Sequence, residues 1–180
     1  PSMDILISSN LERLLYEMSG RNDEQVSEWM ELLKTRGVYT VTPEIRKKVQ
    51  EVFWGGYCDQ EETLKTIESV YNDYSYVVDT HTAVGIDVYD KYVISTGDLT
   101  KTVIVSTASP FKFNESVARA IFGEEAVKDK SEFELLEVLA ERCNLEIPRA
   151  LKDLDKKEVL HKRISKKEQM KDHVLDILGV

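Results

Sequence analysis

The residues best suited to chemistry form the run 106–113, which reads Ser-Thr-Ala-Ser-Pro-Phe-Lys-Phe. The run follows the apolar, β-branched segment 101–105, whose composition predicts a short buried strand. Open α/β sheets bind ligands at the C-terminal ends of their strands, and hydroxyl groups there donate or accept hydrogen bonds without adding charge. A simpler interpretation stays open, because Ser, Thr and Pro also form the turns that follow strands.

Lys112 lies between two phenylalanines of this run. One interpretation is that the apolar setting lowers the pKa of its amine, which would allow a Schiff-base role. The interpretation that we favour is a lysine that lays its alkyl stem along the Phe rings and keeps its ammonium group in water. The function left to Lys112 would then be attraction of an anionic group of a substrate.

The ingredients of a nucleophilic triad are also present, in Ser109, His81 and Asp79. No serine lies in a Gly-x-Ser-x-Gly elbow, which weakens that interpretation. Asp79 and His81 are better explained as first-turn residues of one helix, with Asp79 as its N-cap. The pair Gly55-Gly56 is too short to hold a phosphate group and fits no dinucleotide fingerprint.

The composition gives little support to metal, disulfide or polyanion binding. Cys58 and Cys143 match no metal-binding or redox spacing, and the 3 histidines are scattered. We therefore expect no metal site, and reduced thiols typical of a cytoplasmic protein. The net charge of −9 argues against non-specific binding to nucleic acid or to an anionic membrane, and no apolar run is long enough to span one.

Most of the chain predicts amphipathic helices with recognisable ends. Ser9 and Asn10 are explained first as cap residues, since Ser9-Asn10-Leu11-Glu12 has the form of a capping box. Short strands are expected at 38–41 and 102–107. The expected helices are one that follows the capping box at 9–12 and ends at Met18, 23–36, a stretch from Pro43, one after the cap 59–62 with an apolar stripe from Leu64 to Tyr74, a stretch after Asp79, one from Asn114 to near Gly123, and stretches that follow capping boxes at 131–134 and 165–168.

Three segments carry a resemblance to a known family. They are the N-terminal stretch 1–15, the motif Asp-Thr-His-Thr-Ala-Val-Gly at 79–85, and the run 106–113. In this order and spacing they resemble the C-terminal portion of threonine synthase, the pyridoxal-phosphate enzyme that ends threonine biosynthesis. The resemblance continues to the end of the chain. One departure is Thr80, where the family usually has Pro.

The resemblance implies the fold-type-II class of pyridoxal-phosphate enzymes and conversion of O-phosphohomoserine and water to threonine and phosphate. In that class a Ser or Thr hydroxyl faces the pyridine nitrogen of the cofactor, and the matching residue is Thr107. A neutral hydroxyl makes the ring a weaker electron sink than an aspartate would, and this suits elimination and replacement reactions. The resemblance also makes Asn10, His81 and Lys112 candidates for the substrate side.

Two parts that the family needs are not found in this sequence. In the family, the Schiff-base lysine and the Gly-rich loop for the cofactor phosphate lie upstream of the Ser-Met-Asp segment, and this chain starts at Pro1. We therefore expect a C-terminal piece of a longer enzyme that carries no catalytic residue and does not bind the cofactor tightly alone. The alternative is a stand-alone, non-catalytic helical interaction module derived from such an enzyme.

The expected fold class is α/β, in the form of a mainly helical fragment with a few short strands. Residues 1–123 would form a core part with the cofactor-facing strand end, and 124–180 a helical extension. The strand at 102–107 and the segment 5–8 should be covered by the missing N-terminal portion, because parallel sheets are buried on both faces. Alone, the chain would expose a strand edge or apolar patch and would respond by self-association, by local disorder around Ile5 to Ile7, or by marginal stability. An interaction module would instead cover Val103, Val105 and Ile5 itself.

Overall fold

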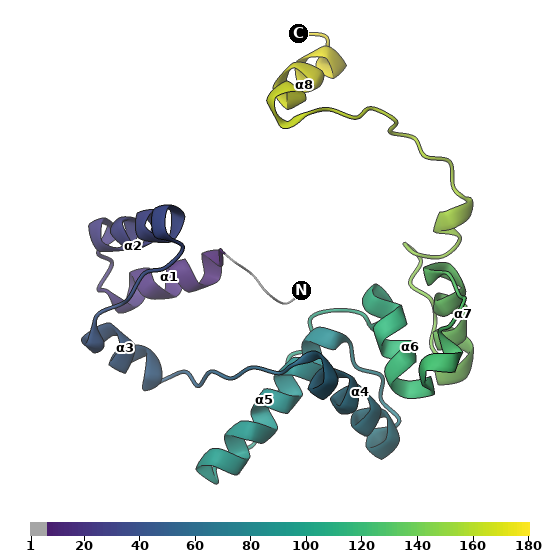
Figure 1. Ribbon diagram of the computed structural model, residues 1–180, viewed down its shortest axis with the longest axis horizontal. Helices are drawn as coiled ribbons and strands as arrows, with labels where there is room; N and C mark the ends of the chain where they lie inside the picture. Colours follow the sequence, from purple (N-terminus) through teal and green to yellow (C-terminus); the bar gives the residue numbers. More distant parts are fainter. Residues whose placement is uncertain (1–6) are drawn as a thin grey trace.

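The structure is a computed structural model that describes residues 7–180. Its helices form one group near the N-terminus (α1 to α3), a second group in the middle (α4 to α7), and a last helix, α8, that lies apart from both (Figure 1). The helices are α1 (Ser9–Met18), α2 (Asp23–Arg36), α3 (Pro43–Gln50), α4 (Gln60–Tyr74), α5 (Thr80–Thr96), α6 (Asn114–Phe122), α7 (Glu132–Cys143) and α8 (Met170–Leu178), with 3-10 turns η1 (Pro110–Phe113), η2 (Glu124–Ala126), η3 (Leu154–Lys156) and η4 (Lys167–Gln169).

Most helix ends lie where the sequence predicts them. Asp59 and Asp79 cap α4 and α5 with their carboxylates, and Ser131 forms the predicted capping box at the start of α7. Pro43 is in the first turn of α3, where no intrahelical hydrogen bond is lost. The helix α2 ends at Gly37, whose φ of 72° is a conformation that other residues rarely adopt.

Two helix starts differ from the prediction. Ser8, and not Ser9, caps α1, because the Ser8 hydroxyl accepts a hydrogen bond from the Leu11 amide at 3.3 Å. Neighbouring serines offer the same hydroxyl, so the sequence pattern did not distinguish them. The predicted capping box at Ser165 is wrong, since the 3-10 turn η4 comes first and α8 begins at Met170.

The N-terminal group is held by a small core of its own. Leu15 of α1, Val26 and Trp29 of α2 and Ile45 of α3 are all buried. The Trp29 ring also stacks on Tyr39, with ring centroids 6.3 Å apart. Each helix contributes an apolar stripe that would be exposed without the others, so the three helices depend on one another.

The larger core lies between α4, α5, α6 and α7. Ile67, Ala83, Val117 and Leu139, one from each helix, have no exposed surface. The helix α4 packs on α5 and α6, and α6 packs on α7. The predicted division at residue 123 thus falls between two helices that share one core.

The strands predicted at 38–41 and 102–107 are wrong, since the part of the chain from residue 7 onward forms no strand. A β-branched composition supplies only a local preference, and a strand also needs a neighbour that pairs with its backbone. Exposure alternates along the second segment, at 83% for Val103, 38% for Ile104 and 70% for Val105. The predicted exposure of Val103 and Val105 is therefore confirmed, whereas Ile5 lies outside the described residues.

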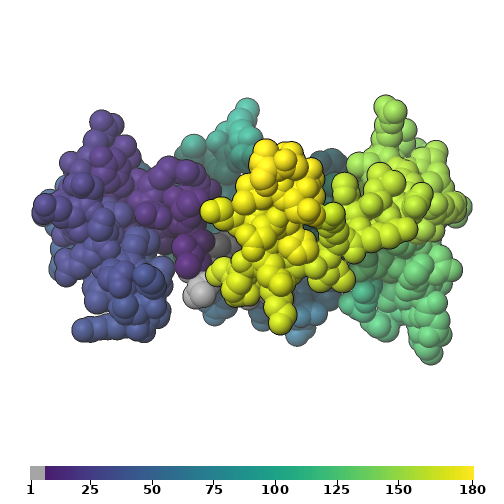
Figure 2. All heavy atoms as spheres, turned by 90° about the horizontal axis from the view of Figure 1, so that it is seen from above, coloured from purple at the N-terminus to yellow at the C-terminus, as the bar shows by residue number. Residues whose placement is uncertain are grey.

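The helix α8 presents an apolar stripe with little cover. The predicted stripe residues Met170, Val174, Ile177 and Leu178 are each more than half exposed. In the view of Figure 2, α8 and the preceding tail (yellow) stand in front of the rest of the chain. The helical spacing was thus predicted correctly, but within the described residues the apolar face is left largely uncovered.

A polar turn follows α5 and starts the segment that leads to the run 106–113, which is called the hydroxyl run below. The Asp98 carboxylate accepts hydrogen bonds from the Thr100 amide at 2.9 Å and from the Tyr92 hydroxyl at 2.6 Å. Hydrogen bonds from Thr100 and Tyr92 lower the pKa of Asp98 to about 2. Because these bonds favour the charged carboxylate, the turn is most stable when Asp98 is ionised.

The turn gives a pH-dependent prediction. The stabilisation by Asp98 is fully present above the unfolded pKa of about 4 and is lost as the pH falls through the folded value of about 2. Replacing Tyr92→Phe removes one donor and should move the Asp98 titration midpoint upward, which NMR of the carboxyl carbon measures. Tyr89→Phe on the same helix is the control and should leave it unchanged. An unchanged midpoint in Tyr92→Phe would contradict the assignment.

Candidate functional site

A buried carboxylate organises the start of α5. Asp79 is only 1% exposed and accepts hydrogen bonds from the amides of His81 at 2.8 Å and Thr82 at 3.2 Å. Its other oxygen accepts the hydroxyl of Thr82. A carboxylate tolerates burial when it is hydrogen-bonded at the positive end of a helix dipole. The predicted role of Asp79 as N-cap is confirmed.

Thr82 connects this helix start to the hydroxyl run. Thr82 Oγ1 lies 3.3 Å from Ser106 Oγ. The Thr82 hydroxyl has one proton, which goes to the Asp79 carboxylate, so the Ser106 hydroxyl must donate to the Thr82 oxygen. The chain of bonds from Ser106 through Thr82 to Asp79 holds the beginning of the run against α5.

Thr107 follows Ser106 in the run and is exposed. A methyl carbon of Ile104 lies 4.0 Å from the position that a Cβ would take at Gly85 of α5. Ile104 and Ser106 line an open cleft beside α4 and α5, and Thr107 is not among the residues that line it.

His81 and Lys112 meet at the ring of Phe113. The His81 and Phe113 ring centroids are 5.4 Å apart, and Lys112 Nζ lies 5.6 Å from the centre of the same Phe ring. Lys112 is exposed, so its stem can follow the ring while its ammonium group stays in water. His81 Nδ1 faces the Asp79 carboxylate at 3.3 Å. These two substrate-side candidates thus share one place at the start of α5.

Ser109 has a local structural role. Its hydroxyl accepts a hydrogen bond from the Phe111 amide at 3.3 Å and caps the turn η1. This is the turn-forming role expected of a Ser-Pro pair. Because Ser109 and Asp79 both act as caps, these contacts support the helix-end interpretation over the nucleophilic triad.

Asn10 lies in the other helix group. Its side chain is exposed in the first turn of α1 and accepts a hydrogen bond from the Arg13 guanidinium. His81 and Lys112 lie at the α5 start and at η1. A substrate role for Asn10 stays a prediction that rests on the family resemblance.

An open cleft of about 800 Å³ lies beside α4 and α5. Thr82, Ser106 and Ile104 line it, together with Asp87 and Asp90 of α5. Burial, and then the neighbouring Asp87, raise the pKa of Asp90. Lys65 of α4 also lines the cleft, so its wall carries charges of both signs.

A second polar cluster was missed by the sequence analysis. Ligand atoms of Cys58, Glu62 and Asp87 lie within 4.8 Å of one another, but Lys91 Nζ lies 2.8 Å from Glu62 and 2.7 Å from Asp87. The ammonium group supplies the positive charge that a metal ion would bring, so we propose no metal there. The spacing of Asp87 and Lys91, four residues apart on one helix, was the signal that could have revealed the cluster.

The two thiols and the helix lengths agree with the compositional analysis where the structure describes them. Cys58 and Cys143 are free and half-buried. Burial raises the pKa of each thiol. From residue 7 to 180, no helix combines the length and apolar character needed to cross a membrane.

Comparison with known proteins identifies the family. The family described as "Threonine synthase, C-terminal" matches residues 82–174, which include α5 from Thr82 onward and the hydroxyl run. The chain belongs to the threonine synthase family. Threonine synthase of Pseudomonas aeruginosa is 35% identical over 124 residues, which are 69% of this chain and 26% of that protein. The Saccharomyces cerevisiae enzyme is 34% identical over 137 residues, 68% of this chain and 27% of that one.

A human protein named threonine synthase-like 1 is 34% identical over 121 residues, which are 67% of this chain and 16% of that protein. The chain spans about a quarter of the length of the bacterial and fungal threonine synthases that it matches. The family relationship therefore applies directly to a C-terminal region of threonine synthases.

Solved structures agree with this assignment. Threonine synthase from yeast has a TM-score of 0.72 and 30% identity, over 99% of this chain and 36% of that chain. The pyridoxal-phosphate-bound threonine synthase from Brucella melitensis has a TM-score of 0.62 and 31% identity, over 88% of this chain and 29% of that chain. The fold is thus that of a region of fold-type-II threonine synthases, and only the expected short strands need correction.

Thr80 offers a test of the helix start. It is the first residue of α5, and among the described residues its buried hydroxyl has no hydrogen-bond partner. Asp79 has φ −78° and ψ 166°, a conformation compatible with a following proline. Thr80→Pro, which introduces the residue usual in threonine synthases, should therefore raise the free energy of unfolding by about 1 kcal/mol.

Urea unfolding of the chain measures this change. The control is Thr82→Pro, which removes the amide and hydroxyl that bind Asp79 and should destabilise the chain. A Thr80→Pro variant that is less stable than the parent chain would show that the α5 start is built differently.

Proposed function

We propose that this chain is the C-terminal part of a threonine synthase that converts O-phosphohomoserine and water to threonine and phosphate with pyridoxal phosphate. The observation that carries the proposal is the structural match to the yeast enzyme, which extends over 99% of this chain but 36% of that one. A match over so much of an extended chain supports the same role for the region as a whole. On this proposal the Schiff-base lysine and the phosphate-binding loop belong to another part of the protein.

The residues around Thr107 suit one end of the cofactor. When bound, pyridoxal phosphate supplies the electron sink for elimination and replacement at an amino acid. Thr107 is exposed, and a hydroxyl can donate to or accept from a ring nitrogen. Ser106, held by Thr82, would orient the backbone that carries Thr107. Thr107 is thus the residue that we assign to the pyridine nitrogen.

The substrate side would use the groups that meet at Phe113. Lys112 brings an exposed positive charge, and His81 lies on the same ring. A lysine there would attract the phosphate of O-phosphohomoserine. Asn10 belongs to the α1 to α3 group, so it would contact the substrate only where that group lies close to Phe113.

The uncovered apolar faces support a larger protein. Val103 and Val105 are exposed, as is the apolar stripe of α8. Such faces are normally covered in a folded protein. We propose that the remainder of the threonine synthase covers them, and that the chain alone self-associates through them. The stand-alone interaction module is less well supported, because it predicted that Val103 and Val105 would be covered within the chain.

The proposal includes the organisation and the location of the protein. Residues 1–123 would carry the cofactor-facing run, and 124–180 would be a C-terminal helical extension. The free thiols and the family are typical of a cytoplasmic enzyme. No role with nucleic acid or membranes is proposed.

One prediction of this proposal concerns cofactor binding and activity of the chain alone. Because it lacks the Schiff-base lysine of the family, it should neither bind pyridoxal phosphate with micromolar affinity nor release phosphate from O-phosphohomoserine. Absorbance titration with the cofactor and a phosphate-release assay measure both. A full-length threonine synthase that contains this region is the positive control. Saturable binding with a lysine-dependent absorbance band would show that the chain holds the cofactor unaided.

Another prediction of this proposal concerns Thr107 in the full-length enzyme. Thr107→Val keeps the shape of the side chain but removes the hydroxyl. We expect a loss of about 1–3 kcal/mol in cofactor binding or transition-state stabilisation, because a polar partner is left unmet. Cofactor affinity and kcat/KM measure the loss, and Thr107→Ser should retain most of both. Full affinity and turnover in Thr107→Val would exclude this role.

A further inference from the structure

The segment that joins α3 to α4 is docked against α5. The Trp54 ring packs edge-on against Tyr92 of α5, with centroids 5.5 Å apart. A Cβ at Gly56 would lie 2.9 Å from the Trp54 ring and 3.0 Å from Val88 of α5. A larger residue at position 56 would require these side chains to shift, so the joining segment (residues 51–58) lies close to the surface of α5 here.

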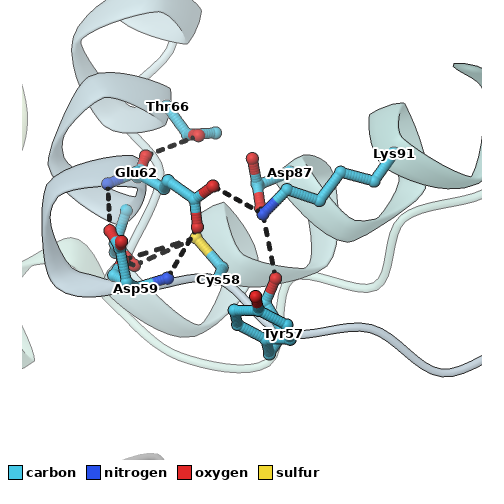
Figure 3. A network of polar contacts seen from close by, with 8 residues as sticks. Tyr57, Cys58, Asp59, Glu62, Thr66, Asp87 and Lys91 are labelled. Atoms are coloured by element: carbon cyan, nitrogen blue, oxygen red, sulfur yellow. Dashed lines mark hydrogen bonds and ion pairs between the residues drawn. The ribbon is translucent and has the colours of Figure 1, made fainter.

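Lys91 of α5 lies where this segment reaches α4. Figure 3 shows its ammonium group between the carboxylates of Glu62 and Asp87, with the Tyr57 carbonyl below. The distances from Nζ are 2.8 Å to Glu62, 2.7 Å to Asp87 and 2.9 Å to the Tyr57 oxygen. The contact with Tyr57 is a hydrogen bond, and the contacts with the two carboxylates are ion pairs.

The three acceptors come from different parts of the chain. Tyr57 belongs to the joining segment, Glu62 to the first turn of α4, and Asp87 to α5 itself. Glu62 also accepts the amide of Asp59 in the capping box of α4. The Lys91 side chain is only 34% exposed and that of Asp87 16%, so water competes less for these bonds than at an open surface.

We propose that Lys91 is a positioning residue that fixes the joining segment, and through it the α1 to α3 group, against the α4–α5 pair. The segment is the covalent connection between the two groups, and it has little apolar cover of its own, since Val52, Phe53 and Tyr57 are exposed. Its placement therefore depends on a few contacts with α5. Lys91 of α5 contacts both the joining segment and α4, so it links these three parts of the chain.

Cys58 provides a probe at the end of the joining segment. Its thiol lies 3.2 Å from the Thr63 hydroxyl and is half-buried under the segment. Burial raises the pKa of this thiol, and the charge of Lys91 acts against that rise. Loss of the charge alone would make the thiol less reactive, whereas release of the segment would expose it. The two effects have opposite signs.

The test is the rate of Cys58 labelling by a thiol reagent, in the full chain with Cys143→Ser so that one thiol remains. Lys91→Met keeps the stem and removes the charge. We expect labelling roughly five-fold faster than in the parent at the same pH, as the loss of a partly buried ion-pair network frees the segment. Lys91→Arg should restore most of the protection, because a guanidinium group also binds both carboxylates.

Matched variants separate positioning from general effects. Lys65→Met removes an exposed ion pair with Glu61 on α4 and should leave labelling unchanged. Gly56→Ala forces the segment off α5 with all charges in place and should also accelerate labelling. The rate of Cys58 labelling in every variant should stay below the rate measured for the chain unfolded in urea. Unchanged or slower labelling in Lys91→Met, or equal acceleration in Lys65→Met, would overturn the proposal.

Discussion

The buried carboxylate of Asp79 is the interaction on which the candidate site depends. It satisfies the first amides of α5 and, through the Thr82 hydroxyl, holds Ser106 of the run. A carboxylate with so little exposure is stable only while these donors are in place. The start of α5 and the beginning of the hydroxyl run are therefore connected, and Thr107 directly follows the residue that makes the connection.

Apolar cover is distributed unevenly over the chain. The groups α1 to α3 and α4 to α7 each bury a core, but Val103, Val105 and α8 remain exposed. Hydrophobic burial stabilises a helix face only when another element covers it. A chain that spans about a quarter of its threonine synthase relatives can leave such faces to the rest of the protein.

Charged groups lie at two places near the hydroxyl run. Asp87 and Asp90 line the cleft together with Lys65, whereas Lys112 lies over the Phe113 ring. Lys91 compensates part of the acidic charge and connects α5 to the segment that enters α4. The proposed attraction of an anionic substrate group depends on the positive charge of Lys112.

The sequence by itself determined most helix ends and the capping roles of Asp59, Asp79 and Ser131, because these depend on residues close together in the chain. It also determined the family, but not the starts of α1 and α8. It gave the wrong state for 102–107, because a strand requires a distant pairing partner that local composition does not reveal. Only the tertiary structure decided that Ser106 bonds Thr82, that His81 meets Lys112, and that Lys91 joins Tyr57 to α4 and α5. Each of these contacts depends on how the helices pack, and packing brings together residues whose separation in the chain carries no signal.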